Sequence, residues 1–180
     1  MNDKMYEMLI NLENKNNLVA IYTDEENPEN FNVGFVAAIN ENDIIIKHVA
    51  PSGSYDGFIL KKTAEIFQIE YEGGYINKIE KLYRLQTKRH SRFPISNTNL
   101  TTELLKFAIE NKFVVSVELN NDGIMNAQGV VLDVNEDDLQ IAQLDEYGNK
   151  DGYANLDVRS ITRIDCDTDQ EQILRMLINN

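Results

Sequence analysis

The chain has 180 residues and is acidic, with 17 Lys and Arg against 30 Asp and Glu and a formal net charge of −13 at pH 7. Nucleic-acid binding depends on cation–phosphate contacts, so this charge disfavours general nucleic-acid binding and leaves only a local basic patch for it. The apolar runs are far shorter than the ~20 residues of a membrane span. The N-terminus has no basic region and no cleavage site typical of a secretory signal, and the single Cys166 excludes an intramolecular disulfide. These features predict a soluble, cytoplasmic protein that does not enter membranes.

The first half begins with a predicted helix, because Met5, Met8, Leu9 and Leu12 recur at helical spacing. Five β-branched runs bounded by turn residues follow and predict strands. These strands are Leu18–Thr23, Val33–Ile39, Ile44–Val49, Gly57–Leu60 and Ile66–Tyr71. A closing helix is predicted by the apolar stripe of Ile76, Ile79, Leu82 and Tyr83.

The next segment, residues 86–99 (QTKRHSRFPISNTN), has one Pro, many polar residues and little periodicity. It predicts a basic linker between a domain over residues 1–85 and a second domain over residues 100–180. Its candidate contact residues for nucleic acid or a partner are Lys88, Arg89, His90, Arg92 and Phe93. Cations beside an aromatic ring can hold phosphate and stack a base. The alternative, which we favour, is a linker whose charges pair with the acidic second half.

The second half repeats the order of elements. Leu104, Leu105, Ala108 and Ile109 predict a helix after a polar run able to cap it. The predicted strands are Val114–Leu119, Gly129–Val134, Leu139–Leu144, Gly152–Leu156 and Ile161–Cys166. Thr168 and Glu171 form a capping-box signature before a closing helix.

An internal repeat accounts for this order. Shifting the sequence by 95 residues matches glycine, turn and apolar positions without a gap from Gly34 to Ile69. The matched pairs include Gly34 with Gly129, Asn40 with Asn135, Asp43 with Asp138, Gly53 with Gly148, and Gly57 with Gly152. The copies differ in charge, because residues 1–95 carry 11 Lys and Arg against 14 Asp and Glu, whereas residues 96–180 carry 6 against 16.

The repeated phrase Asn-Glu-(Asn or Asp)-Asp marks a turn in each copy. Residues 40–43 and 135–138 each join two predicted strands through a four-residue connection. Asn and Asp suit such turns because their side chains bond nearby backbone N–H groups. We therefore expect two hairpins of the same geometry.

A helix followed by five short, strongly bent strands resembles the Sm-like (Lsm) fold, a small open barrel of the SH3-like kind. The resemblance is carried by the pattern Gly34-x-Val36-x-x-Ile39-x-x-x-Asp43 and by its counterpart from Gly129 to Asp138. It implies a mainly β, α+β protein of two tandem Sm-like five-stranded small barrels, each flanked by short helices. The residues expected to set this fold are Gly34, Asn40, Asp43, Gly57, Gly129, Asn135, Asp138 and Gly152.

The RNA site of the Sm-like family is not carried over with the fold. Sm proteins that bind RNA usually carry an Arg-Gly pair between strands four and five. Here that region reads Leu60-Lys61-Lys62-Thr63 in one copy and Asp157-Val158-Arg159-Ser160 in the other. The family's habit of pairing strand four with strand five of the next barrel implies a homo-oligomer through the edge strands.

Candidate catalytic and metal motifs fail on inspection. The stretch Asp165–Asp169 begins like a calcium loop but lacks the glycine at position six and the glutamate at position twelve, so we interpret it as a strand end before a helix. Cys166 with His48 or His90 is a weak nucleophile–base pair, and no spacing fits zinc. No cofactor, metal site or catalytic residue is therefore predicted.

These observations predict a non-catalytic interaction module, an adaptor or regulator that binds a protein partner. One alternative is an RNA-binding protein that uses the basic linker and the loop faces. A further alternative is a small hydrolase that uses the acidic loops, such as Glu136-Asp137-Asp138.

Overall fold

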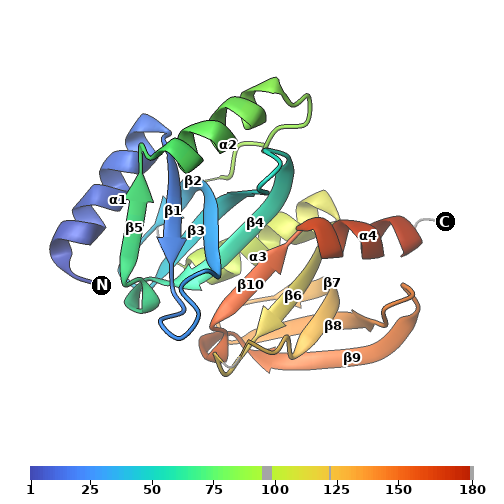
Figure 1. The fold of residues 1–180 in the computed structure, drawn as a ribbon. Coiled ribbons are helices and arrows are strands. Elements are labelled where there is room, and N and C mark those ends of the chain that lie inside the picture. Colours follow the sequence, from blue (N-terminus) through green and yellow to red (C-terminus); the bar gives the residue numbers. More distant parts are fainter. Residues whose placement is uncertain (95–98, 122, 179–180) are drawn as a thin grey trace. The chain divides into compact units, whose positions relative to one another are not determined.

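The computed structural model describes residues 1–94, 99–121 and 123–178, and it is mainly β with four helices (Figure 1). The chain divides into two compact units. The first comprises Met1–Gly57 and Lys61–Phe93, and the second comprises Phe58–Leu60 and Pro94–Asn180. Of the expected linker, residues 86–93 belong to the first unit, whereas residues 95–98 lie outside the described part.

The first unit carries an antiparallel arrangement of strands in the order β5-β1-β2-β3-β4. Its elements are α1 (Asp3–Lys15), β1 (Leu18–Tyr22), β2 (Phe31–Ile39), β3 (Asp43–Val49), β4 (Tyr55–Lys62, apart from Phe58–Leu60), β5 (Gln68–Tyr71) and α2 (Gly74–Leu85). Side chains alternate along β1, so that Ala20 lies in a core with Ile79 of α2 while Val19 lies in a core with Leu9 of α1. The two helices therefore cover opposite faces of the same strands.

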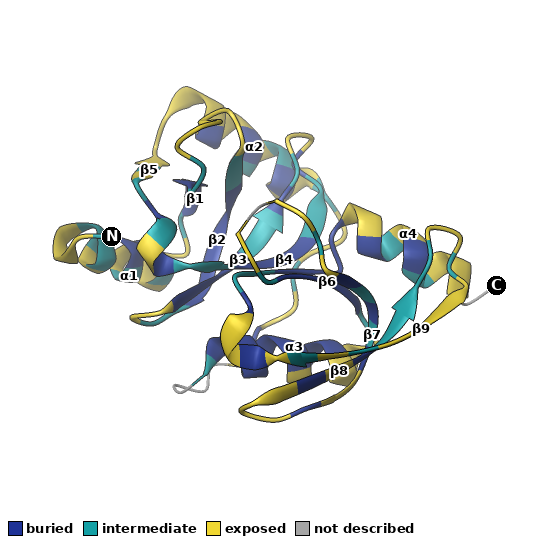
Figure 2. Ribbon diagram, turned by 90° about the horizontal axis from the view of Figure 1, so that it is seen from below, coloured by how far each residue is buried: buried dark blue, intermediate teal, exposed yellow. Residues whose placement is uncertain are grey.

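The second unit has the strand order β10-β6-β7-β8-β9, which repeats that of the first with five added to each strand number. Its elements are α3 (Leu100–Asn111), β6 (Val114–Glu118), β7 (Ala127–Val134), β8 (Asp138–Leu144), β9 (Lys150–Asp157), β10 (Arg163–Cys166) and α4 (Asp169–Ile178). Figure 2 shows that β6 is buried and β9 is largely exposed.

The predicted repeat is confirmed at the level of backbone register. Gly34 lies opposite His48 and Gly129 lies opposite Gln143, each two positions before a β-bulge at the same place in its copy. A bulge inserts an extra residue into one strand and increases the local twist and bend. Both copies therefore bend their second strand at the same position.

Most strand boundaries differ from the prediction by one or two residues, and only the fifth strand of each copy starts later than predicted. The fifth strand of each copy starts at Gln68 or Arg163 rather than at Ile66 or Ile161. A short 3₁₀ turn, Thr63–Glu65 or Val158–Ser160, precedes these isoleucines. Both isoleucines are buried, and their apolar character makes them resemble strand residues in the sequence.

Candidate functional site

The basic segment after α2 folds back onto the first unit. The Lys88 ammonium lies 4.0 Å from the centroid of the Tyr55 ring. The Arg89 guanidinium donates hydrogen bonds to the carbonyl oxygens of Tyr83 and Arg84 in the last turn of α2. The last carbonyls of a helix have no partner within the helix and carry its partial negative charge, so Arg89 both caps and stabilises this end.

His90 fixes the segment to β4 and α2. Its Nε2 lies 2.8 Å from the carbonyl oxygen of Gly57, so Nε2 carries the proton and donates it. Its Nδ1 then accepts from the Tyr83 hydroxyl at 2.9 Å, and its ring lies 4.5 Å from the Tyr55 ring. Burial lowers the pKa of His90 to about 4, with nearby Lys47 acting in the same direction. We call Lys88–His90 the strap.

The last two candidate residues of the segment differ in exposure. Arg92 is exposed, and its charge helps lower the pKa of Lys47, after the larger effect of burial. Phe93 is buried, with 2% of its surface exposed. Arg89 and His90 are thus used within the first unit, and nucleic-acid or partner contact by this segment stays a prediction.

The turn residues have the predicted local role in both copies. Asn40 Oδ1 accepts hydrogen bonds from the backbone N–H groups of Asn42 and Asp43, at 2.9 and 2.7 Å. Asn135 Oδ1 accepts equivalent bonds from the N–H groups of residues 137 and 138, both at 2.9 Å. The copies diverge at the last turn position, because Asp43 is buried against Lys62 at 2.7 Å whereas Asp138 is exposed. The turn asparagines therefore act in the fold.

Two further signature glycines occupy backbone conformations that favour glycine. Gly57 has φ +66° and Gly152 has φ +91°, a region that residues with a Cβ rarely adopt. Gly57 is buried beneath His90, whereas Gly152 is exposed. The same backbone feature is thus covered in one copy and open in the other.

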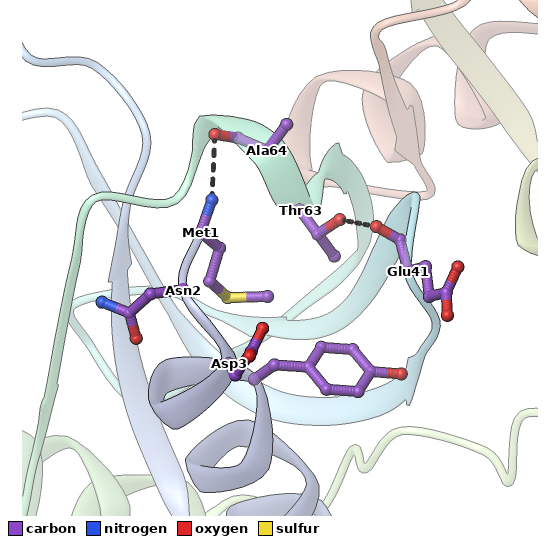
Figure 3. Close-up of a pocket in the computed structure, with 7 residues that line it drawn as sticks. Met1, Asn2, Asp3, Glu41, Thr63 and Ala64 are labelled. Atoms are coloured by element: carbon purple, nitrogen blue, oxygen red, sulfur yellow. Dashed lines mark hydrogen bonds between the residues drawn. The ribbon is translucent and has the colours of Figure 1, made fainter.

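A pocket of about 350 Å³ lies beside the start of α1 in the first unit (Figure 3). Its walls include the N-terminal ammonium, which contacts the carbonyl oxygen of Ala64 at 3.5 Å, and the side chains of Asp3 and Tyr6. Thr63 Oγ1 donates to the carbonyl oxygen of Glu41 at 2.5 Å, which closes one side. The lining holds no nucleophile beside a base, so we assign no chemistry to it.

A polar cluster lies beneath α4, and no motif in the sequence predicts it. Glu171 is buried and accepts hydrogen bonds from the hydroxyls of Ser116 and Thr168. Gln128 Nε2 donates to Ser116 Oγ at 2.8 Å. In the first copy the inward position of Glu171 on the helix is taken by Ile76. The available signal was one acidic residue in an otherwise apolar helical stripe, which the capping-box interpretation absorbed.

We expect Glu171 to make the second unit more stable as the pH falls. Burial raises the pKa of its carboxyl, although the two hydroxyl bonds act against this. Between the unfolded value of 4.5 and the raised pKa, the folded protein binds the proton more tightly than the unfolded chain does, so stability decreases as the pH rises. Urea unfolding of the second unit at pH 7 and pH 5, followed by amide NMR signals of β6, measures this. Wild type should gain stability relative to Glu171→Gln at the lower pH, and an equal response of both proteins would refute the prediction.

Cys166 is fully buried in β10, and burial raises the pKa of its thiol well above the ordinary value. His48 is paired with Asp56 at 3.0 Å in the first unit, and His90 is used by the strap. The described contacts of the two histidines therefore involve residues of their own unit. The stretch 165–169 is the end of β10 followed by α4, as predicted.

Most of the exposed large apolar side chains lie on the second unit. In the described part of the chain, α4 exposes Ile173, Met176, Leu177 and Ile178, and the β8–β9 turn exposes Tyr147. A Cβ atom added to Gly148 in that turn would lie 2.7 Å from the Cβ atom of Leu177, so the turn packs against α4. We call Ile173, Met176, Leu177 and Tyr147 the α4 patch.

The chain matches no protein-family model, no curated protein and no solved structure. Within the described ranges, no helix has the length and apolar character needed to cross a membrane. The same ranges hold no group of three or more His, Cys, Asp and Glu side chains placed to bind a metal ion.

Proposed function

We propose that the protein is a non-catalytic interaction module, an adaptor or regulator, built from two Sm-like barrels and binding a protein partner. Support for the barrels is the shared order of a helix, five strands and a closing helix, with the same bulge in each copy. The observation that carries the function is the α4 patch. Large exposed apolar areas on folded proteins commonly mark interaction sites.

Comparison of the two closing helices shows that an apolar side chain at two of these exposed positions is specific to the second copy. Ile173 and Met176 are 46% and 59% exposed, whereas the equivalent positions of α2 are Lys78 and Lys81. A lysine at these positions suits a solvated helix face, and an apolar side chain there lowers solubility unless it is covered. The acidic groups around the α4 patch, including Asp145, Glu146 and Asp169, favour a partner surface that is apolar with basic residues around it.

A pull-down of the tagged chain from its native host tests the proposal. The double variant Ile173→Lys and Met176→Lys gives α4 the side chains that α2 carries, and it should lose the partner. Interface hot spots of this kind contribute about 2 kcal/mol or more, so the recovered amount should fall by about tenfold or more. Leu85→Lys makes the same chemical change at an exposed site on the first unit and should have no effect. Equal recovery with the double variant and wild type would contradict the proposal.

One specific observation favours the RNA-binding alternative, because Lys88 and Arg92 are both exposed on one short segment. The same pull-down separates it from the first proposal when half of each sample is treated with RNase. A partner that survives RNase supports the protein-binding function. RNA that is recovered by wild type and lost with Lys88→Ala and Arg92→Ala supports the alternative.

We further propose self-association through the edge strands. β5 and β9 stand at the ends of the strand orders of their units, and β9 is largely exposed. Edge strands present backbone groups that can pair with another strand. Light scattering measures the molar mass in solution, and a monomer of 20.6 kDa at every concentration tested would contradict this proposal.

A further inference from the structure

The strap covers a surface of the first unit whose counterpart in the second unit is exposed. In the first unit, the strap contacts Tyr83, Tyr55 and the carbonyl of Gly57. Tyr83 is 8% exposed. Phe35 is 6% exposed, and the centroid of its ring lies 5.2 Å from that of the Tyr83 ring. This corner is therefore closed by the chain's own basic segment.

The equivalence of the two corners follows from how each closing helix sits on its unit. A Cβ atom added to Gly53 would lie 2.3 Å from the Cβ atom of Leu82, and the matching distance from Gly148 to Leu177 is 2.7 Å. The same helix position therefore meets the same hairpin glycine in both copies. With this shared offset of 95, Ile178 takes the place of Tyr83.

Strand register defines the exposed surface of the second unit. Val130 pairs with Ala142, which pairs with Tyr153, so these three side chains lie on one face of the strands. This is the face that α4 covers, because Ser116, which contacts Glu171 of α4, pairs with Gln128 two residues before Val130. Tyr153 is 57% exposed and Ile178 is 41% exposed, whereas Val130 and Ala142 are half-buried. We call Val130, Ala142, Tyr153 and Ile178 the open corner.

Two observations indicate what covers the open corner. The first is the occupant of the matching corner, an extended segment with Lys88, Arg89 and a ring at His90. The second is charge, since residues 96–180 carry 16 Asp and Glu against 6 Lys and Arg. At the corner itself, the Lys150 ammonium lies 4.1 Å from the centroid of the Tyr153 ring. Asp145, Glu146 and Asp151 neighbour Lys150 in the β8–β9 hairpin, so acidic residues outnumber basic ones there.

We propose that the open corner binds an extended basic segment of a partner protein that carries a histidine or aromatic ring. The ring packs on Val130 and Ile178, which match Phe35 and Tyr83 of the covered corner, next to Tyr153 and the Lys150 ammonium over its ring. The cations lie along the acidic β8–β9 hairpin. The inference rests on the proposed function and names the kind of partner segment. It uses a different surface from the α4 patch.

A peptide titration of the ¹⁵N-labelled full chain tests this. The probe is a peptide with the sequence of residues 86–93, QTKRHSRF. The prediction is a saturable shift of the amide signals of Val130, Ala142, Gly152 and Tyr153. Two changes should each weaken binding by about tenfold, as for a central interface anchor. One is Tyr153→Lys in the chain, at an exposed site, and the other is a peptide carrying H90A and F93A.

Four results would overturn the inference. The first two are the absence of a saturable shift and equal binding of the peptide without rings. The third is a shift of the Gly57 and Tyr83 signals, which would show that the peptide exchanges with the strap. The fourth is the appearance of the same shifts when the protein concentration alone is changed. The last result would identify a second copy of the chain as the occupant. Ile173→Lys should leave peptide binding unchanged, because Ile173 lies outside the open corner. If this variant binds the peptide but fails to capture the partner, the inference stands. The two proposals can therefore fail separately.

Discussion

Replacing Gly34 or Gly129 by alanine should destabilise the unit that carries it by about 3 kcal/mol, the upper end for forcing an extra methyl group into a packed site. A Cβ atom at Gly34 would lie 2.3 Å from the carbonyl oxygen of Lys47, and one at Gly129 would lie 2.0 Å from that of Ala142. Both contacts are with the backbone of the neighbouring strand, which cannot rotate away. The two strands must therefore separate at the bend.

Urea unfolding followed by amide NMR signals from each unit measures both variants separately. Gly74→Ala is the control, because nothing lies within 4 Å of its added Cβ atom and it sits at the start of α2. Alanine there should stabilise by at most about 1 kcal/mol, the difference in helix propensity. A loss below about 0.5 kcal/mol in Gly34→Ala, the size of an ordinary surface change, would show that this close approach does not set the fold.

Acidification from pH 7 to pH 4 should release the strap and destabilise the first unit by about 3 kcal/mol through His90. Its pKa in the folded protein is about 4, against 6.5 for the ordinary group. Between these values the unfolded chain binds the proton more tightly than the folded one, so stability falls as the pH falls through this window. Each unit of pKa difference corresponds to 1.36 kcal/mol, which gives the stated size.

The physical reason lies in the two hydrogen bonds of the imidazole. Nδ1 accepts from the Tyr83 hydroxyl, and a proton on Nδ1 would remove that acceptor and place a charge near Lys47. His90→Gln keeps a donor for Gly57 and an acceptor for Tyr83 without a titrating group. The unfolding free energy of the first unit at pH 7 and pH 4, followed by the Gly57 and Tyr83 amides, should depend on pH far less in this variant. The same pH dependence in both proteins would refute the role of His90.

Local chemistry made the repeat and the hairpins predictable from the sequence. The Asn40 and Asn135 turns depend on side chains that bond backbone groups two and three residues away. Gly34 and Gly129 stand out because each is followed by an apolar run, Phe35-Val36 in the first copy and Val130-Val131 in the second. Such features can be recognised in a single sequence because the residues that determine each of them lie within a few positions of one another.

The strap was not predictable in the same way. His90 bonds Gly57, which lies 33 residues earlier, and nothing in the sequence near either residue indicates the contact. A run of cations without periodicity is typical of a linker, and it is also compatible with capping a helix end. Only the fold shows that Arg89 meets the last turn of α2.

The candidate sites of the second unit were not predictable from the sequence, because they depend on which side chains other segments leave exposed. Ile178 continues the inward stripe of α4, so its sequence position predicts burial, yet 41% of its surface is exposed. Exposure of an inward-facing residue depends on whether another segment covers it, which periodicity does not report. Glu171 illustrates the reverse case, in which an acidic residue is buried because Ser116 and Thr168 stand beneath it.

Binding of a protein partner through the second unit is tested most directly by a hydrogen–deuterium exchange footprint of the chain bound to the partner recovered by pull-down. We expect slower exchange on binding in α4 and in the β8–β9 hairpin, residues 169–178 and 145–153, with no change in residues 1–93. Protection confined to the strap and the first unit would contradict it, because the partner would then recognise the surface that the chain already covers.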